Sequence, residues 1–440
     1  MDNELKDLCK WAINTAQKAG SQECKVILVK SRKVTIRYRE QKPEVIKEAN
    51  TQTLALEVFM NGKYSVQSTP DIRETSLEDF IQKAIRNTSY LEEDPFRSLP
   101  DPELYGQIPE IDLQKTDPVY PDFSADQRHE LVREVENTCI EQGGDKLISI
   151  DSSISDQYAN ILTMTSNGFE GEDEGTQFSI ETNMSVQGEG DRKPQGFSKF
   201  TTRMLDDLPS AGMISDYTLK NTLSQIGAKK IKTEKMPVII ENKNSRNVLS
   251  GFLEAMTGQN LQQKSSFLLD KKDKKVGSDL FTLYDEPLLP KGLGSRRFDG
   301  DGFPCKKRIM IGEGVLKDYY INWYYSRKLE CSPTTEGPTN LIIPPGERSV
   351  EEIIKDLGRG ILITGFIGGN SNPTTGDFSL GVFGQLFDQG QIVQPVSEMN
   401  IADNHLEFWN KLVEAANDPW PYHSRRLPSL VFSDILVAGT

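Results

Sequence analysis

The sequence predicts an α+β protein of two domains, in which antiparallel, β-rich sheets pack against helices. Strand-like runs come in pairs joined by turn residues, and helical patterns interrupt them only occasionally, without a βαβ alternation. The chain has 440 residues, more than one hydrophobic core normally serves. We place the domain boundary near residue 228, at a helix and hinge, so that the two domains are residues 1–228 and 229–440.

The first domain begins with a helix and continues as an antiparallel meander. Apolar residues recur at helical spacing up to Ala16, and Gly20 follows where a helix would end. Four alternating runs then predict four strands, and the pair Asn61-Gly62 predicts a tight hairpin turn before the next strand. The four runs are residues 24–30, 33–40, 44–49 and 54–60.

Two further helices and a long connection complete the first domain. A helix is expected to start near Thr75, with Glu78 closing a capping box. Residues 94–123 carry six prolines and predict an extended connection across the surface. A helix then begins at Ser124, capped together with Gln127, and strands paired around Asn167-Gly168 come next.

The second domain restarts with a strand over residues 236–242 and a helix that buries Val248, Phe252 and Leu253. Strand pairs follow, one of them a hairpin within residues 307–327. A helix capped by Ser349 and Glu352 interrupts the strands. The sheet then resumes with residues 360–366, 378–396 and 429–439.

Composition limits the class of partner and the compartment. The net charge of −14 disfavours nucleic acid and anionic membranes, because both require clustered Lys and Arg. No signal-peptide core and no run of 18 apolar residues is present. The five cysteines are scattered and form no CxxC pair, which favours a reducing compartment. We therefore expect a cytoplasmic protein that binds neither nucleic acid nor membranes.

Two segments resemble common binding motifs, a dinucleotide-binding loop and a calcium loop, but their residues do not have the required spacing. Gly292-Leu293-Gly294 lacks the third glycine of a dinucleotide-binding loop. The segment 298–303, FDGDGF, fits a calcium loop only if Arg297 and Arg308 occupy ligand positions, so a tight turn is the better interpretation.

Histidines and clustered carboxylates give weak candidates only. None of His129, His405 and His423 neighbours a nucleophile motif or another histidine at metal-ligand spacing. His423 is the strongest of the three, because it shares a loop with Arg425 and Arg426. Four carboxylates after the Asn-Gly turn favour a solvated hairpin over a cation site: Glu170, Glu172, Asp173 and Glu174.

One long segment near the C-terminus nevertheless resembles a known family. Residues 374–402, TTGDFSLGVFGQLFDQGQIVQPVSEMNIA, are similar to the C-terminal signature of the TldD/PmbA family, metalloprotease-related proteins once called modulators of DNA gyrase. The resemblance covers essentially the whole chain. Further segments fit the family in the same order: 68–74, 94–103, 166–171, 264–270, 332–346 and 429–439.

The resemblance implies a degenerate zinc site. The family has two branches that pair as a heteromeric protease, and the TldD branch has a zinc helix of the form H-E-x-x-x-H with a further cysteine ligand. The matching helix here is residues 253–258, where Leu253 and Gly258 replace the two histidines and only Glu254 of the motif residues remains. No cysteine follows Cys331. The chain thus resembles the PmbA branch, also called TldE, and we expect no metal and no catalytic residue in it.

The function that the resemblance implies is a non-catalytic subunit. It would bind a TldD-like zinc subunit and admit unfolded peptides, for peptide maturation and antitoxin turnover, with zinc only in the partner. The alternative is a free-standing homodimeric scaffold that binds peptides without proteolysis, and a third possibility is an independent enzyme that uses carboxylates or His423. Thr375, Gly376, Asp377 and Phe378 either shape the sheet or line a groove in which a peptide or the partner docks by strand addition.

Overall fold

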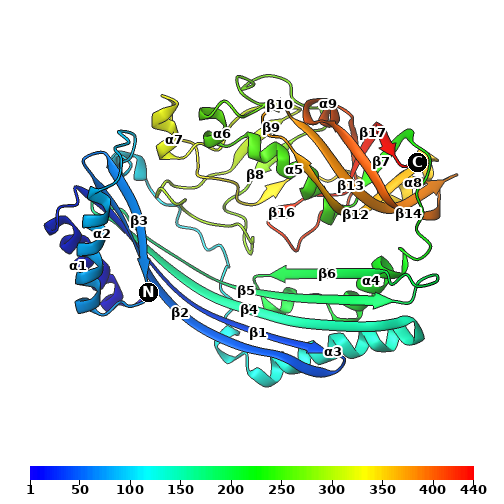
Figure 1. The fold of residues 1–440 in the computed structure, drawn as a ribbon, viewed down its shortest axis with the longest axis horizontal. Helices are drawn as coiled ribbons and strands as arrows, with labels where there is room; N and C mark the ends of the chain where they lie inside the picture. The colour runs from blue at the N-terminus through cyan, green and yellow to red at the C-terminus, as the bar shows by residue number, and fades with distance from the viewer.

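A long, curved, antiparallel sheet forms the first half of the molecule and faces the second half (Figure 1). The computed structural model describes residues 1–440. The strand order is β3-β2-β1-β4-β5-β6, so β3 and β6 are the edges. The strands are β1 (Glu23–Arg39), β2 (Lys42–Met60), β3 (Lys63–Thr69), β4 (Leu147–Thr165), β5 (Glu170–Val186) and β6 (Gln195–Thr202).

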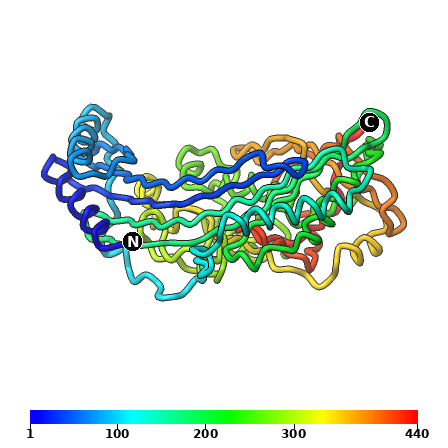
Figure 2. The backbone as a smooth tube through the Cα atoms, turned by 90° about the horizontal axis from the view of Figure 1, so that it is seen from below, coloured from blue at the N-terminus to red at the C-terminus, as the bar shows by residue number.

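The expectation of four short strands before residue 61 is wrong, because β1 and β2 are continuous. They pair from Glu23 with Phe59 to Arg39 with Lys42, with one irregularity at Arg37. The polar residues that suggested a break after Lys30 lie in the middle of β1, which is hydrogen-bonded to β2 on one side and β4 on the other. Backbone pairing on both sides overrides the local pattern. Figure 2 shows these strands crossing the molecule.

Four helices cover one face of this sheet. Helices α1 (Asn3–Lys18) and α2 (Glu74–Ser89) bury one end, where they contact Val26 and Leu28, and α3 (Ala125–Gly143) and α4 (Ala211–Leu223) bury the other end, where they contact Val34 and Ile36. These β1 residues all have even numbers and therefore point to the same face. The capping box at Ser124 is confirmed, whereas α2 begins after Arg73 without a side-chain cap, so the box predicted at Thr75 is wrong.

The opposite face of the sheet is polar and turns toward the second half. A row of hydroxyl groups crosses it: Thr35 lies 3.1 Å from Ser155, which pairs in register with Ser179, and Ser179 lies 3.0 Å from Thr201. Lys25 Nζ donates to the carbonyl of Gly300 in the second half at 2.8 Å.

Two sheets share the largest core in the second half. Their orders are β14-β13-β12-β7-β17-β15 and β10-β9-β8-β11-β16. The strands are β7 (Glu234–Ile240), β8 (Leu283–Asp285), β9 (Arg308–Gly312), β10 (Val315–Leu316), β11 (Leu341–Ile342), β12 (Gly360–Ser371), β13 (Asp377–Asp388), β14 (Gln391–Asn404), β15 (Leu412–Ala415), β16 (Arg425–Arg426) and β17 (Leu430–Ala438). The helices are α5 (Asn242–Ala255), α6 (Gly258–Gln262), α7 (Trp323–Lys328), α8 (Val350–Leu357) and α9 (His405–Asn410).

These elements confirm the predicted α+β class, and some of the local predictions hold as well. The capping box of Ser349 and Glu352 is present at α8. The hairpin predicted within residues 307–327 is confirmed for β9 and β10, whereas its end forms α7 instead of a strand. The first sheet ends at Thr202 and the next strand begins at Glu234, and the boundary near residue 228 stays a prediction. None of the helices is both long and apolar enough to span a membrane.

The proline-rich connection, residues 94–123, runs along the contact between the halves and contains only two short 3₁₀ turns, Pro102–Tyr105 and Tyr120–Asp122. Two more such turns lie at Gly144–Lys146 and Leu205–Asp207. The connection is anchored, because Leu99 and Leu113 are buried and Asp94 pairs with Lys328 at 3.3 Å.

A buried ion pair joins α3 to the first sheet. Arg128 and Asp156 are 1% and 0% exposed, and the guanidinium donates to both carboxylate oxygens at 2.6 and 2.8 Å. Arg128 also donates to the carbonyl of Phe123 and lies over its ring. Each of the three guanidinium nitrogens therefore donates a hydrogen bond, which offsets the cost of burying the charge.

Removing one partner should destabilise the protein strongly. Asp156→Ala leaves a buried guanidinium without its counterion, so we expect a loss of about 3–5 kcal/mol in the free energy of unfolding. The control is Glu48→Ala, which removes an exposed pair with Arg32 on the same sheet and should cost less than about 1 kcal/mol. Denaturant unfolding measures both, and equal losses would contradict the account.

A buried histidine lies in the core of the second half. His405 is 2% exposed, its ring stacks on Phe267, and its Nε2 lies 2.8 Å from Ser371 Oγ. Its Nδ1 has no partner. Burial lowers the pKa of His405 to about 4, so the imidazole stays neutral in the folded protein.

His405 should make stability depend on pH. Its pKa is about 4 when folded and about 6.5 when unfolded, so the unfolded chain binds the proton first as the pH falls. The stabilisation from His405 is therefore complete above pH 6.5 and disappears toward pH 4. Relative to His405→Leu, wild-type stability should fall by an amount on the order of 2 kcal/mol between about pH 7 and about pH 4.5. A difference that stays constant across this range contradicts the assignment.

Candidate functional site

The predicted zinc-helix positions are divided between two helices. Leu253 and Glu254 lie in the last turn of α5, whereas Gly258 starts α6, so the single helix expected over residues 253–258 is wrong. The break occurs because Thr257 caps α6 and Gly258 donates its N–H to the carbonyl of Tyr320 at 2.7 Å. Neither contact is visible in the helical spacing.

These positions do not fit a zinc ion. Leu253 is buried in the core and Gly258 has no side chain, so only Glu254, which is exposed, offers a donor atom. A Cβ at Gly258 would lie 2.8 Å from Cβ of Tyr325, which leaves no room for a larger residue. No three His, Cys, Asp or Glu side chains gather elsewhere in a metal-binding arrangement.

The turn before β13 shapes the sheet. Gly376 has a φ of +85° and donates its N–H to the carbonyl of Asn372 at 2.8 Å. Asp377 accepts a hydrogen bond from Asn404 at 2.9 Å, and Asn404 and Thr375 lower its pKa. Phe378 is buried against His405, so its expected place in the lining of a groove is wrong. A docking role for the exposed Thr375 and Asp377 stays a prediction.

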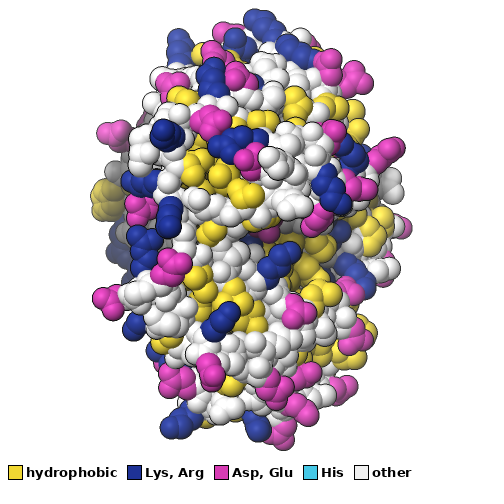
Figure 3. All heavy atoms as spheres, turned by 90° about the vertical axis from the view of Figure 1, so that its right-hand side faces the viewer, with side chains coloured by type: hydrophobic (Ala, Val, Ile, Leu, Met, Phe, Trp, Pro, Cys, Tyr) yellow, Lys and Arg dark blue, Asp and Glu magenta, His cyan; other side chains and the backbone are white.

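A groove lies where the two halves meet. Its main cavity has a volume of about 590 Å³ and is lined by β6, α4, the first turns of α5, and parts of β12 and β13. The loop 420–423 completes it. Figure 3 shows apolar side chains in a hollow between the two halves, beside Lys and Arg side chains. Six aromatic residues line the cavity: Phe197, Tyr217, Phe366, Phe383, Trp420 and Tyr422.

The groove is basic although the protein is acidic. The main cavity is lined by Lys199, Lys243 and Arg246 and by no Asp or Glu. A neighbouring cavity of about 650 Å³ shares Gln225 and Phe383 with it. That second cavity adds four cations and one acid, Arg192, Lys193, Lys229 and Lys230 with Glu398. The net charge of the chain is −14, so positive charge is concentrated here.

The edge strand β6 supplies backbone groups to the groove. Its outer edge pairs with no other strand, and Gln225 Nε2 donates to the carbonyl of Gln195 at 2.9 Å. Phe197 is 53% exposed beside this edge. The loop 420–423 packs against the same strand, because the rings of Trp420 and Tyr422 contact the ring of Phe200 in β6. An open edge next to apolar side chains can pair with an extended segment.

His423 lies in this groove, as the residue that the sequence favoured among the histidines. Its Nδ1 accepts a hydrogen bond from the backbone N–H of Arg425 at 2.9 Å. Burial, followed by the charges of Arg246, Arg425 and Lys199, lowers its pKa to about 4. The sequence pointed to Arg425 but not to Arg246 or Lys199, because the groove gathers residues from separate segments.

The other candidates have local structural partners. His129 Nδ1 lies 3.0 Å from Tyr38 Oη. Asp299 accepts the N–H of Phe303 at 3.0 Å, as the tight-turn interpretation of residues 298–303 requires. Asp301 accepts the N–H of Trp323 at 2.8 Å.

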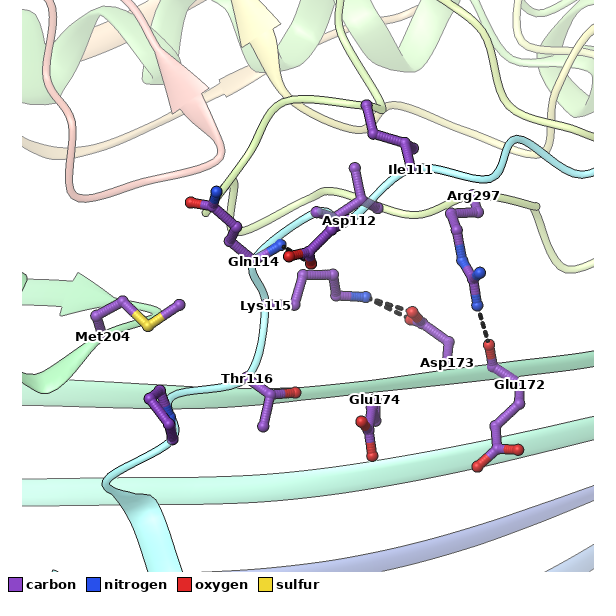
Figure 4. Close-up of a pocket in the computed structure, with 12 residues that line it drawn as sticks. Ile111, Asp112, Gln114, Lys115, Thr116, Glu172, Asp173, Glu174, Met204 and Arg297 are labelled. Carbon is purple, nitrogen blue, oxygen red and sulfur yellow. Dashed lines mark hydrogen bonds and ion pairs between the residues drawn. The ribbon is translucent and has the colours of Figure 1, made fainter.

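Three of the β5 carboxylates, Glu172, Asp173 and Glu174, border a separate cavity of about 740 Å³, shown in Figure 4. Lys115 lies 2.5 Å from Asp173, and Lys6 lies 3.0 Å from Glu172. The solvated-hairpin interpretation therefore holds for the exposed Glu170 and Glu174 but is wrong for the half-buried, paired Glu172 and Asp173. Lys6 and Lys115 already neutralise the charges of Glu172 and Asp173. The basic groove is therefore the stronger candidate site.

Comparison with known proteins gives one family over the whole chain. Domain 1 of the PmbA/TldA metallopeptidases matches residues 24–88, their central domain residues 119–226, and their C-terminal domain residues 233–439. A metalloprotease PmbA homolog from Haemophilus influenzae is 26% identical, with 100% of this chain and 97% of the relative aligned. The metalloprotease PmbA of Escherichia coli O157:H7 is also 26% identical, over 99% and 97% of the two chains.

Solved structures agree with this match. A candidate modulator of DNA gyrase from Bacteroides thetaiotaomicron is 35% identical, with a TM-score of 0.97 and all of both chains covered. TldE from Thermococcus kodakarensis is 19% identical, with a TM-score of 0.86 over 98% of this chain and 100% of its own, which shows a shared fold. With these matches along its whole length, this chain belongs to the PmbA/TldD family of metallopeptidases and their relatives.

Proposed function

We propose that this chain is a non-catalytic subunit of a TldD/TldE-type zinc metalloprotease and that it holds unfolded peptides for a zinc-bearing partner. The observation that carries the proposal is the environment of Leu253 and Gly258. At the two histidine positions of the motif, one side chain is buried in the core and the other position is closed by Tyr325.

The chemistry of hydrolysis supports this division of work. A catalytic zinc site needs three protein ligands and an open position for water or substrate. Glu254 is the one motif residue left, and a glutamate without a metal-bound water nearby has no water to activate. We assign zinc binding and peptide hydrolysis to the partner, a TldD-like chain with H-E-x-x-x-H, and we expect both chains in the cytoplasm.

The groove supports a role in substrate handling. An unfolded peptide can pair its backbone with the open edge of β6, as extended peptides do with other sheet edges. Sequence-independent backbone pairing suits substrates for peptide maturation or antitoxin turnover, because such substrates differ in sequence. The second candidate function is a homodimeric scaffold that binds peptides in the same groove without any protease, and the same groove favours it equally.

Zinc content and peptidase activity test the proposal. The purified chain should contain far less than one zinc per molecule and cleave no unfolded peptide, because it lacks the ligands. Co-expression with a TldD-like chain should give a heteromer that cleaves unfolded peptides, and a chelator should abolish this cleavage. Elemental analysis, size-exclusion chromatography and a peptide-cleavage assay measure these properties.

A matched pair of variants locates the catalytic residue. Glu254→Gln in this chain should leave the activity of the heteromer unchanged, whereas Glu→Gln in the partner's motif should abolish it. Zinc near one per chain with chelator-sensitive cleavage by this chain alone would contradict the proposal. A stable homodimer without affinity for the partner favours the scaffold.

A further inference from the structure

We propose that the basic groove selects carboxylate-bearing peptides, with the peptide backbone on the β6 edge and the peptide carboxylates against Lys199 and Arg246, which line the main cavity. This inference rests on the proposed function and adds to it the chemical class of the substrate. It concerns binding only, and no bond is made or broken in this chain.

The ion pairs of the groove leave unmatched positive charge. Lys199 pairs with Glu181 at 2.6 Å, Lys243 with Glu241 at 3.1 Å, and Lys230 with Glu398 at 3.4 Å. Four other lining cations take part in none of the ion pairs of the structure: Arg192, Lys193, Lys229 and Arg246. The protein has 65 acidic residues and a net charge of −14, yet the cations that line this groove outnumber the acidic residues that pair with them.

Two arginines that follow His423 in the sequence, Arg425 and Arg426, add positive charge beside the cavity although neither lines it. Arg425 donates to Ser250 Oγ at 2.6 Å and to the carbonyl of Arg246 at 3.3 Å, and it has no acidic partner. Arg426 is half-buried and its Nε has no hydrogen bond, and the one acidic group that acts on its charge is Asp207. Burial lowers the pKa of both guanidinium groups. A partly desolvated cation without a counterion costs free energy, and a carboxylate bound at Arg246 would offset that cost through paired hydrogen bonds.

The β6 edge favours a peptide over a nucleic acid. Single-stranded nucleic acid also binds basic, aromatic grooves, but it gains nothing from an open strand edge. A peptide can use the edge, the aromatic side chains and the cations together. The strand covers residues 195–202, which at about 3.3 Å per residue matches an extended peptide of roughly eight residues.

Fluorescence anisotropy with labelled octapeptides tests the inference on the full chain. One probe carries acidic side chains and an amidated C-terminus, a second carries neutral side chains and a free C-terminus, and a third is neutral and amidated. We expect at least one of the two carboxylate-bearing probes to bind at least tenfold more tightly than the third. Tight binding of the first probe identifies side-chain carboxylates as the ligand, and tight binding of the second identifies the C-terminal carboxylate.

Charge-reversal variants locate the site. Arg246→Glu should weaken binding of the carboxylate-bearing probes at least tenfold. Arg133→Glu, a charge reversal at an exposed position of α3, should change the affinity for these probes less than twofold. N-methylation of alternate peptide nitrogens should also weaken binding about tenfold, because it removes donors to the strand edge.

Three results would overturn the inference: equal binding of all three probes, no effect of Arg246→Glu, or tighter binding of an oligothymidylate than of any peptide. Failure of the proposed function looks different, because the chain alone would then cleave the probes, which mass spectrometry of the same samples detects.

Discussion

Strand β1 is the element on which the rest of the structure depends, because it is paired along its whole length with β2 on one side and β4 on the other. Continuous pairing keeps its polar middle in the sheet and lets one sheet carry two separate helix pairs at its ends. All four helices therefore cover a single face. The other face and the β6 edge are left for the second half of the molecule.

The arrangement determines where charge and backbone groups meet. The loop 420–423 packs on Phe200 and brings His423 beside β6, while α5 contributes Arg246 from the second half. No single segment contains the groove. The basic character arises because residues from both halves, each ordinary in its own sequence, lie together in an acidic protein.

The sequence predicted the elements better than their lengths or meeting points. Helix caps at Ser124 and Ser349 and the turn at Asn61-Gly62 follow from local chemistry, so they could be predicted. The length of β1 could not, because the hydrogen bonds that extend it come from β4, more than a hundred residues later in the chain. Likewise, the break at Thr257 depends on a contact with Tyr320.

In the candidate site, too, local features could be predicted from the sequence and long-range contacts could not. That a leucine and a glycine stand at positions 253 and 258 is plain in the sequence, whereas the burial of Leu253 and the closure around Gly258 depend on residues far along the chain, such as Tyr325. The sequence left open whether Phe378 shapes the sheet or lines a groove, and its place in the core beside His405 could not be predicted because His405 lies 27 residues later in the chain. Of the residues that line the basic groove, the sequence singled out His423, because it shares a loop with Arg425 and Arg426, and it gave no sign that β6 and α5 would meet there.

Hydrogen–deuterium exchange of this chain with and without an unfolded acidic peptide tests the central claim most directly. The account predicts slower exchange at the amides of residues 195–202, because a bound strand pairs with their outer edge. Unchanged exchange in β6, at peptide concentrations that saturate binding, would contradict it.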